Sequence, residues 1–463
     1  MGLSAAKHRK NDKAGLAARR AALAILSAVL DDARPVDDAL MQLHAAGLEP
    51  RDRAFVVALV QTSLRRKGES EAIIARFLTK KLPRKSGNAA LILFLGTTQL
   101  LYLETPAHAV IDLAVTLARE DRDARHFANL INAVLRKLVD VKPIDRPRLN
   151  VPDWLWRRWT KTYGNDIAEA IAHAHLAEPA LDLSVKSDPE AWAKALNGIA
   201  LPTGSVRLKD RSGAIEGLPG FGDGAWWVQD AAAALPVRLL GDVAGRTVLD
   251  LCSAPGGKTA QLAARGAKVT AVDQSAPRMA RVSENLDRLK LAAELVVADV
   301  LEFPSDRLFD AVLLDAPCSA TGTIRRHPEL PFIKSEQQIA ELVELQARLL
   351  AHAAKLVRPG GSLIYCTCSL EPEEGEDQVE RFLGGHPDYG RVKLAVEDVA
   401  GESRFITPKG DLRSLPSMNI GQDQGLDGFY AARLARLVTA LPAKVGTGLA
   451  IEEAPKRMSL ANP

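Results

Sequence analysis

Residues 247–259 read Thr-Val-Leu-Asp-Leu-Cys-Ser-Ala-Pro-Gly-Gly-Lys-Thr, a short apolar strand that runs into a turn with two adjacent glycines. Gly256 and Gly257 let the backbone approach a ligand closely, and a helix beginning there favours negative charge at its N-terminus. Strand-like and helix-like segments then alternate as far as residue 366. This alternation predicts a doubly wound α/β sheet, in which ligands bind at the carboxyl ends of the strands.

The alternating region gives specific element predictions. We expect strands at 247–251, 268–272, 294–298, 311–314 and 362–366, and helices at 259–265, 277–289 and 339–356. The residues that end these strands are unusually rich in acids and cysteines. We therefore look for the functional site among them.

The remaining sequence predicts a multi-domain protein, since 463 residues correspond to about three domains of roughly 150 residues. Residues 14–142 carry apolar side chains at helical spacing and predict an all-helical domain. Residues 143–235 combine a helix-like piece at 154–177 with short β-like runs such as 181–185, which predicts a small α+β connector. The α/β domain then spans 236–437. We expect the basic segment 1–13 and the polar tail 438–463 to be disordered.

Composition narrows the class of protein. Hydrophobic residues make up 47% and charged residues 25%, as in ordinary soluble proteins. The longest apolar stretches fall short of the ~20 residues that span a membrane. Asp31 and Asp32 stand where a secretory signal would be cleaved, so we expect a cytoplasmic protein. The net charge of +3 permits an RNA partner without demanding one.

The turn has one rival interpretation, because Gly257-Lys258-Thr259 ends like a P-loop. Cys252 stands where the first P-loop glycine belongs, and Pro255 removes one of the N–H groups that would cradle a phosphate. These two departures argue against a nucleoside triphosphatase.

Two acids follow the next strands. Asp273 comes 16 residues after Gly257, close to the ~20-residue spacing at which a carboxylate binds a ribose diol. Asp299 follows the third strand, where it can meet the base edge of the same nucleoside. A nucleoside-containing cofactor is implied, and the alternative for either acid alone is a helix N-cap.

The four cysteines are Cys252, Cys318, Cys366 and Cys368, too few and too clustered for a disulfide framework. They form no C-x₂-C pair, which disfavours a metal site. Cys366 and Cys368 lie two apart in a strand, ~6.5 Å between Cα atoms, which disfavours a redox disulfide. Each lone cysteine has a buried structural alternative. Because Cys318 and Cys368 end adjacent strands, nucleophilic catalysis is the interpretation that is left.

These motifs resemble those of the RNA cytosine-5 methyltransferases of the RsmB (Fmu/Sun) family, which use S-adenosylmethionine. The resemblance covers about residues 225–437 and rests on 228–231, 252–259, 315–322, 324–328, 365–374 and 427–430. The helical region is similar to a NusB-type RNA-binding domain through 106–115 and 127–136. The resemblance implies a NusB-like domain, a Rossmann-like class I methyltransferase domain and a small-subunit ribosomal RNA substrate.

The chemistry of that family explains the two cysteines. Cytosine C5 is a weak nucleophile, so a thiolate first adds to C6 and makes C5 carbanion-like. By resemblance, Cys368 is this thiolate, and Cys318 assists loss of the C5 proton and release of the enzyme. Asp315, protonated or sharing a proton, is expected to hydrogen-bond N3/N4 of the base. Lys258 and the positively charged sulfonium of the cofactor are candidate positive neighbours of the thiolate. Cys366 has no family role and is expected to pack.

The resemblance also implies a cofactor-binding set. Its members are Cys252, Ser253, Ala254, Pro255, Gly256, Gly257, Lys258, Asp273, Asp299 and Asp315. No metal and no membrane partner is expected, and we expect a monomer.

A target base must leave its stack to enter such a site, which favours an RNA loop or bulge. Arg325 and Arg326 follow the Cys318 loop and are expected to bind phosphates. The alternative is a pair of solvated surface charges.

Three other functions are alternatives to this one. A transfer RNA cytosine-5 methyltransferase is one alternative. A non-catalytic RNA-binding or antitermination factor is disfavoured because Cys368, Cys318, Asp315 and Lys258 are all present. An adenine or guanine N-methyltransferase would carry a different motif after the fourth strand.

Overall fold

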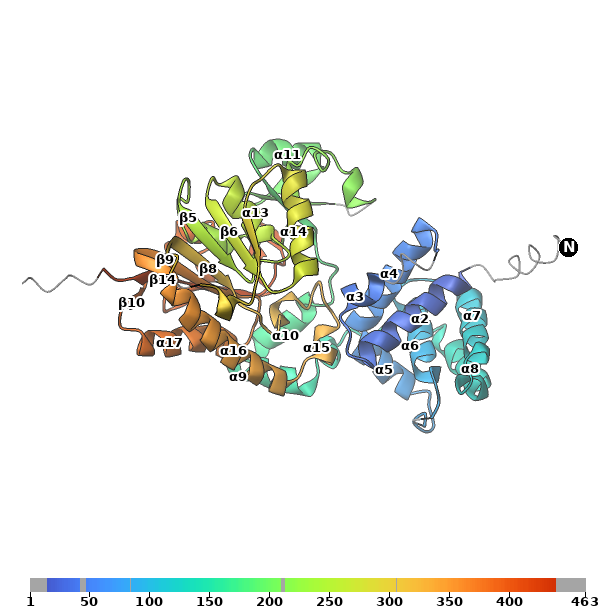
Figure 1. The fold of residues 1–463 in the computed structure, drawn as a ribbon. Helices are drawn as coiled ribbons and strands as arrows, with labels where there is room; N and C mark the ends of the chain where they lie inside the picture. Colours follow the sequence, from blue (N-terminus) through green and yellow to red (C-terminus); the bar gives the residue numbers. More distant parts are fainter. Residues whose placement is uncertain (1–14, 42–46, 84, 210–212, 305, 439–463) are drawn as a thin grey trace, which may run out of the picture.

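The computed structural model describes residues 15–41, 47–83, 85–209, 213–304 and 306–438 (Figure 1). A helical domain, a connector and an α/β domain follow one another along the chain. The segments predicted to be disordered, 1–13 and 438–463, lie outside the described residues except for Val438.

The N-terminal domain is all helical, as predicted. Its helices are α2 (Leu16–Leu30), α3 (Val36–Leu40), α4 (Pro50–Arg65), α5 (Lys67–Ala75), α6 (Ala89–Leu101), α7 (Ala107–Glu120) and α8 (Ala128–Leu138). α6 is apolar on all sides and buried along most of its length, so it forms the centre of the domain. α8 instead buries one stripe, Ile131, Val134, Leu135 and Leu138, at helical spacing.

The connector contains two helices where the sequence predicted one over 154–177. α9 (Asp153–Tyr163) and α10 (Asn165–Ala174) are separated at Gly164, whose φ is 83°. Such a φ is readily adopted only by glycine and ends the first helix. Both helices pack on Ile324, Leu330 and Leu370 of the α/β domain.

The connector also contains an antiparallel sheet in the order β2-β3-β1-β4. Its strands are β1 (Asp182–Val185), β2 (Gly198–Ala200), β3 (Ser205–Leu208) and β4 (Trp226–Val228), with α11 (Pro189–Ala195) inserted. β1 confirms the β-like run at 181–185.

The α/β domain has a mixed sheet in the order β10-β14-β9-β8-β5-β6-β7. Its strands are β5 (Thr247–Leu251), β6 (Lys268–Asp273), β7 (Glu294–Val297), β8 (Phe309–Asp315), β9 (Val357–Thr367), β10 (Tyr389–Arg391) and β14 (Phe429–Arg436), and β11 (Leu412–Ser414) pairs with β14. The five predicted strands, β5 to β9, are parallel. β14, which the sequence did not predict, runs antiparallel to β9.

Helices cover both faces of this sheet (Figure 1). They are α12 (Leu235–Arg238), α13 (Gly257–Ala264), α14 (Ala276–Leu289), α16 (Glu336–Lys355) and α17 (Glu376–Gly385). The short helix α15 (Leu330–Ile333) instead packs against the connector helices and the helical domain. α12 and α13 share a core with Val248 and Ile364, whereas α16 and α17 share one with Leu249 and Leu363. Successive residues of a strand face opposite sides of the sheet, and here helices bury both sides. The strands are therefore almost wholly apolar.

The strand order reverses between β5 and β8. From β5 the chain moves outward to β6 and β7, and it then returns to β8 and β9 on the other side. Loops on the two sides of such a reversal diverge and leave a crevice at the carboxyl ends of the strands. The turn after β5 and the segments after β8 and β9 therefore meet at one place.

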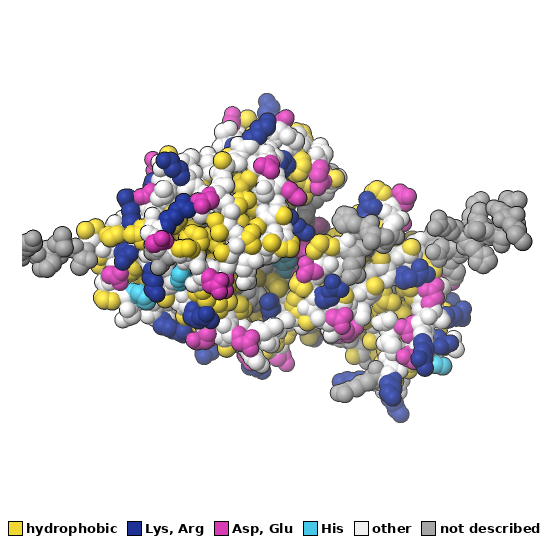
Figure 2. Space-filling view, viewed as in Figure 1, with side chains coloured by type: hydrophobic (Ala, Val, Ile, Leu, Met, Phe, Trp, Pro, Cys, Tyr) yellow, Lys and Arg dark blue, Asp and Glu magenta, His cyan; other side chains and the backbone are white. Residues whose placement is uncertain are grey.

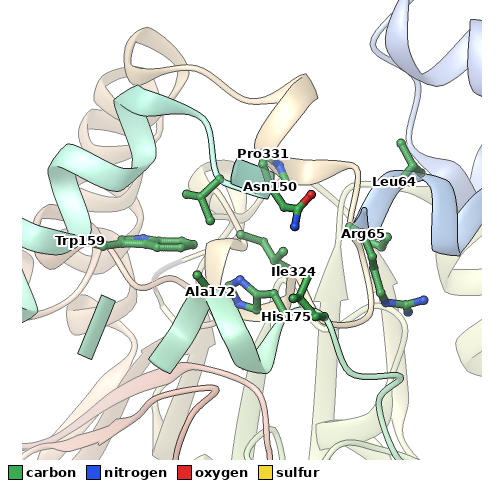
Figure 3. Close-up of a pocket in the computed structure, with 11 residues that line it drawn as sticks. Leu64, Arg65, Asn150, Trp159, Ala172, His175, Ile324 and Pro331 are labelled. Carbon is green, nitrogen blue, oxygen red and sulfur yellow. The ribbon is translucent and has the colours of Figure 1, made fainter. Parts of the chain in front are cut away.

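The helical domain contacts the segment that follows the Cys318 loop. The Val36 amide donates to Glu329 Oε1 at 3.3 Å, and the Arg65 guanidinium donates to the Arg325 carbonyl at 3.1 Å. A small pocket lies at this junction, where α4, α9, α10 and the 324–331 segment converge (Figure 3). Trp159 and His175 point into it from the connector helices (Figure 3). The three parts of the chain thus meet beside the loop that carries Cys318.

Candidate active site

The turn after β5 exposes its backbone to a cleft. Cys252 and Gly256 both have positive φ, 59° and 95°. A Cβ on Gly256 would lie 2.9 Å from Val282 Cγ1, so a side chain is excluded by space as well as by conformation. Ser253, Ala254, Pro255, Gly256 and Gly257 all line the cleft. The first-turn amides of α13 and a bare turn suit a ligand with a polar, partly anionic end.

Asp273, at the end of β6, shapes this turn. It is buried, and its two carboxylate oxygens accept the amides of Ala254 at 3.2 Å and Ser275 at 2.9 Å. Asp299 is exposed and accepts the Leu301 amide at 2.9 Å, at the start of the short helix Val300–Glu302. Both acids thus make local backbone contacts, and their binding of a nucleoside stays a prediction.

The cleft is wide and open to solvent, with about 1880 Å³ of space counted from its walls out into the solvent. Its floor includes Lys258, Asp315, Cys368 and Phe429, and one wall is α14. Pro35, Asp37 and Asp38 of the helical domain line the opposite side. The space-filling view shows the molecule hollowed between α14 and the helical domain (Figure 2). A flexible polymer can therefore reach the floor from between the two domains.

The two predicted catalytic cysteines meet beside the cleft, which Cys368 lines and Cys318 does not. Cys318 Sγ lies 3.5 Å from Cys368 Sγ, although the residues are 50 positions apart in the chain. The Gly322 amide donates to the Cys368 carbonyl at 3.0 Å and ties the two segments together. The hydrogen bond with Cys368, together with burial, raises the pKa of Cys318 well above its ordinary value. Cys318 is therefore a protonated thiol in this state, and Cys368 is the thiol that lines the cleft.

Lys258 and Asp315 form a salt bridge beside the thiols. Lys258 Nζ donates to Asp315 Oδ2 at 2.7 Å and lies 4.9 Å from the centre of the Phe429 ring. Burial lowers the pKa of Lys258, but Asp315 and the nearby Cys366 and Cys368 outweigh it and raise this pKa above its usual range. Lys258 is thus a fixed positive charge near Cys368, as predicted for a thiolate neighbour.

The other two cysteines are enclosed. Cys366 is fully buried, and its thiol donates to Asp315 Oδ1 at 3.5 Å. Burial and the Asp315 carboxylate raise the pKa values of both Cys366 and Cys252 above the ordinary value. Both therefore stay protonated thiols near neutral pH.

Asp250 is a buried acid that the sequence-based site lacked. Its Oδ2 accepts the Thr259 hydroxyl at 2.6 Å, whereas its Oδ1 has no hydrogen-bond partner among the described residues. Burial raises its pKa to about 7. Asp250 lies within the stretch 247–259, but it is the fourth residue of β5. The sequence therefore indicated a residue of the sheet and not of the site. Phe429 was likewise missed, although it lies in the closing Asp427–Tyr430 motif.

The two arginines expected to bind RNA lie in different environments. Arg325 is only 4% exposed, and its Nη2 pairs with Asp230 at 3.1 Å and Asp427 at 3.4 Å. Arg326 pairs with Asp427 at 2.5 Å, but 39% of its side chain is exposed and it lines the cleft. A buried, doubly paired guanidinium is not available to a phosphate. We therefore keep only Arg326 among the proposed RNA contacts.

The described residues contain neither a metal-binding cluster nor a membrane-spanning helix. Within the described ranges, no group of three or more His, Cys, Asp or Glu side chains is arranged to hold a metal ion. None of the described helices combines the length and the apolar character needed to cross a membrane.

Comparisons with known proteins agree with this geometry. The model of the family "16S rRNA methyltransferase RsmB/F" matches residues 237–435, and that of the NusB family matches 16–140. Ribosomal RNA small subunit methyltransferase B of Cronobacter sakazakii is 36% identical over 83% of this chain and 91% of its own. The protein of the same name from Vibrio cholerae is 32% identical over 90% and 97%. The solved structure of PH0851 superposes with a TM-score of 0.73 at 24% identity, over 91% of this chain and 99% of that one.

Proposed function

We propose, from the premise that this chain belongs to the RsmB/F family of 16S ribosomal RNA methyltransferases, that it methylates C5 of a cytosine in small-subunit ribosomal RNA. S-adenosylmethionine, when bound, supplies the methyl group. A substrate in the small ribosomal subunit places the activity in the cytoplasm, and we propose that the protein acts as a monomer.

The observation that carries the proposal is the 3.5 Å separation between the sulfur atom of Cys368, which lines the cleft, and the sulfur atom of Cys318 beside it. Attack on C6 and removal of the proton from C5 act on adjacent ring atoms, so the two groups must reach one base together. Two converging thiols are suited to covalent catalysis on an electron-poor ring.

The Cys368 thiolate forms an Sγ–C6 bond, and the electron pair of the C5–C6 double bond moves to C5. C5 accepts the methyl group as the S–CH3 bond of the donor breaks and its electron pair stays on the donor sulfur. Cys318 first loses its thiol proton to water and then, as a thiolate, takes the C5 proton; the C5–C6 double bond is restored, and Cys368 leaves C6 as a thiolate. The raised pKa of Cys318 makes its thiolate form a stronger base for that proton.

Lys258 and Asp315 support the first step. Asp315 lines the cleft and, sharing a proton with the base, hydrogen-bonds its N3/N4 edge, where negative charge accumulates as Cys368 adds. Lys258 is held at 2.7 Å from Asp315 and keeps a positive charge beside the reacting thiol. In water this charge would be screened, but Lys258 is 8% exposed, so its effect on Cys368 is stronger.

The turn 252–257, Lys258 and Asp315 are the proposed cofactor contacts, with Asp273 and Asp299 toward its ribose and its base. The bare backbone at Gly256 and the amides of α13 fit a ligand that combines a polar end with a nucleoside. These residues orient the donor towards the cleft floor, which Lys258, Asp315 and Cys368 share.

RNA enters from the side between the helical domain and α14. The NusB-like domain supplies one wall, and Arg326 projects into the same cleft. A loop or bulge is the proposed substrate, because its bases leave the stack at lower cost than those of a duplex.

The test is bisulfite sequencing of ribosomal and transfer RNA from cells that lack the gene, complemented with wild type or with Cys368→Ala. We expect one small-subunit cytosine to lose protection without the gene and to regain it only with wild type. Cys366→Ala is the matched cysteine control and should restore protection. Protection of a transfer RNA position instead would favour the transfer RNA alternative, and unchanged RNA in all strains would favour a non-catalytic factor.

A further inference from the structure

Each of the two cysteines is followed by a serine, and the two serines converge on one buried carboxylate. The Ser319 and Ser369 hydroxyl oxygens lie 3.1 Å apart. Each hydroxyl lies 2.5 Å from Glu374 Oε2, to which it donates. Glu374 is fully buried, in the short helix Pro372–Glu374. A single oxygen therefore links the two chain segments that carry Cys318 and Cys368.

The second oxygen of the same carboxylate holds the Cys318 loop from its backbone. Glu374 Oε1 accepts the Ser319 amide at 2.9 Å and Gln346 Nε2 at 3.0 Å. The same Gln346 nitrogen donates to the Pro317 carbonyl at 2.8 Å. The residues on both sides of Cys318 are thus fixed to Glu374, one directly and one through Gln346.

The other cysteine is fixed through its own neighbours. The Ser369 carbonyl accepts the Arg413 guanidinium at 2.5 Å, and the Glu374 carbonyl accepts the Tyr365 hydroxyl at 2.7 Å. Tyr365 belongs to the end of β9 and Cys368 follows directly after it, so Glu374 is itself anchored to that strand. The carboxylate therefore spans from the end of β9 to the loop after β8.

We propose that Glu374 is the positioning residue that sets the spacing of the two catalytic thiols. It does not line the cleft, so it touches neither base nor cofactor. The residues that donate to it, Ser319, Gln346 and Ser369, are fully buried and would lose this acceptor together. Without this carboxylate, Ser319 and Ser369 share only hydroxyl contacts, with each other at 3.1 Å and with Thr321 Oγ1 at 3.5 and 3.4 Å, and the 3.5 Å sulfur contact loses its charged support.

The role rests on the proposed function, but its geometry can be measured apart from methyl transfer. Phenylarsine oxide, an arsenical that bonds two thiols at once, reports whether Cys318 and Cys368 are close enough to be bridged. The bridged peptides are identified by mass spectrometry after digestion. Methylation of small-subunit ribosomal RNA from a strain lacking the gene gives kcat and KM in parallel.

Glu374→Gln is the decisive variant, because Gln has the shape of Glu but replaces one acceptor oxygen by a donor group. We expect bridging to slow at least tenfold and kcat to fall by about 100-fold, as for reacting groups misplaced by about 1 Å. The KM for RNA should not change, and Glu374→Asp, which retains both acceptors, should recover part of kcat. Ser369→Ala removes one of the hydroxyl donors to Glu374 but leaves the carboxylate in place, and it covers the case in which Glu374→Gln fails to fold.

Asp182→Asn is the matched control, since Asp182 is a buried carboxylate that binds Arg207 and the Ala231 amide in the connector. It should keep wild-type bridging and kcat. Wild-type bridging in Glu374→Gln, or equal losses in Asp182→Asn, would overturn the positioning role. Lost bridging with normal methylation would uphold that role and overturn the two-thiol function instead.

Discussion

Gly256→Ala tests whether the turn after β5 is built around a bare backbone. Gly256 has a φ of 95°, where an alanine costs about 1–2 kcal/mol of backbone strain. An added Cβ would also lie 2.9 Å from Val282 Cγ1 and 3.1 Å from its Cγ2. Overpacking of this kind costs a further ~1–3 kcal/mol. The free energy of unfolding should therefore fall by roughly 2–5 kcal/mol in total.

Gly245→Ala separates the two costs. Gly245 has a φ of 72°, but a Cβ there would meet no atom within 4 Å. Gly245→Ala carries the backbone strain alone. Gly256→Ala should therefore lower the free energy of unfolding by about 1–3 kcal/mol more than Gly245→Ala does. Urea denaturation followed by circular dichroism measures both, and calorimetric titration with S-adenosylhomocysteine measures cofactor-site affinity.

Of the two variants, only Gly256→Ala should weaken binding of S-adenosylhomocysteine. Its Kd should rise about tenfold for each 1.4 kcal/mol of binding free energy that is lost. Equal losses of stability in the two variants would show that Val282 yields without cost. Unchanged affinity in Gly256→Ala would show that the turn does not bind the cofactor, which would refute the reasoning about the cleft.

Three further predictions concern charged groups. Burial raises the pKa of Asp250 from its unfolded value of about 4 to about 7. The stability it contributes is therefore complete below pH ~4 and is lost as pH rises towards 7, by up to a few kcal/mol. Urea denaturation should show that the free energy of unfolding falls less over about pH 4–8 in Asp250→Asn than in the wild type. Arg325→Ala should destabilise the protein by about 3–5 kcal/mol, because it leaves Asp230 and Asp427 buried with less compensation, and a loss below 1 kcal/mol would contradict the buried ion pair. Arg326→Ala should weaken RNA binding and reduce its salt dependence by about one phosphate contact, measured by filter binding over a range of salt concentrations; an unchanged salt slope would remove Arg326 from the interface.

The sequence predicted the parallel part of the sheet because each strand is an apolar run that ends in a distinctive residue. It missed β14 because residues 429–436 alternate too weakly to stand out, and the strand forms by pairing with β9. It joined α9 and α10 because apolar spacing continues across Gly164, whose backbone conformation only the fold reveals.

The sequence also predicted some residues of the candidate site and missed others. Strand ends indicated Cys318, Cys368 and Asp315, because parallel strands bring their carboxyl ends together. The burial of Arg325 depends on Asp230 and Asp427, which lie about 100 residues away on either side, and no local pattern encodes it. The convergence of Ser319, Ser369 and Glu374 is of the same kind, since each residue taken alone is an ordinary polar residue after a strand.

The most direct test of the account is the covalent bond between Cys368 and its target base. Cys318→Ala, incubated with S-adenosylmethionine and unmethylated small-subunit ribosomal RNA, should accumulate an RNA–protein adduct that survives denaturation, because attack survives while release fails. Mass spectrometry of the digested adduct should locate the nucleotide on Cys368. Free, fully methylated RNA released at the wild-type rate, or a nucleotide attached to a different cysteine, would contradict it.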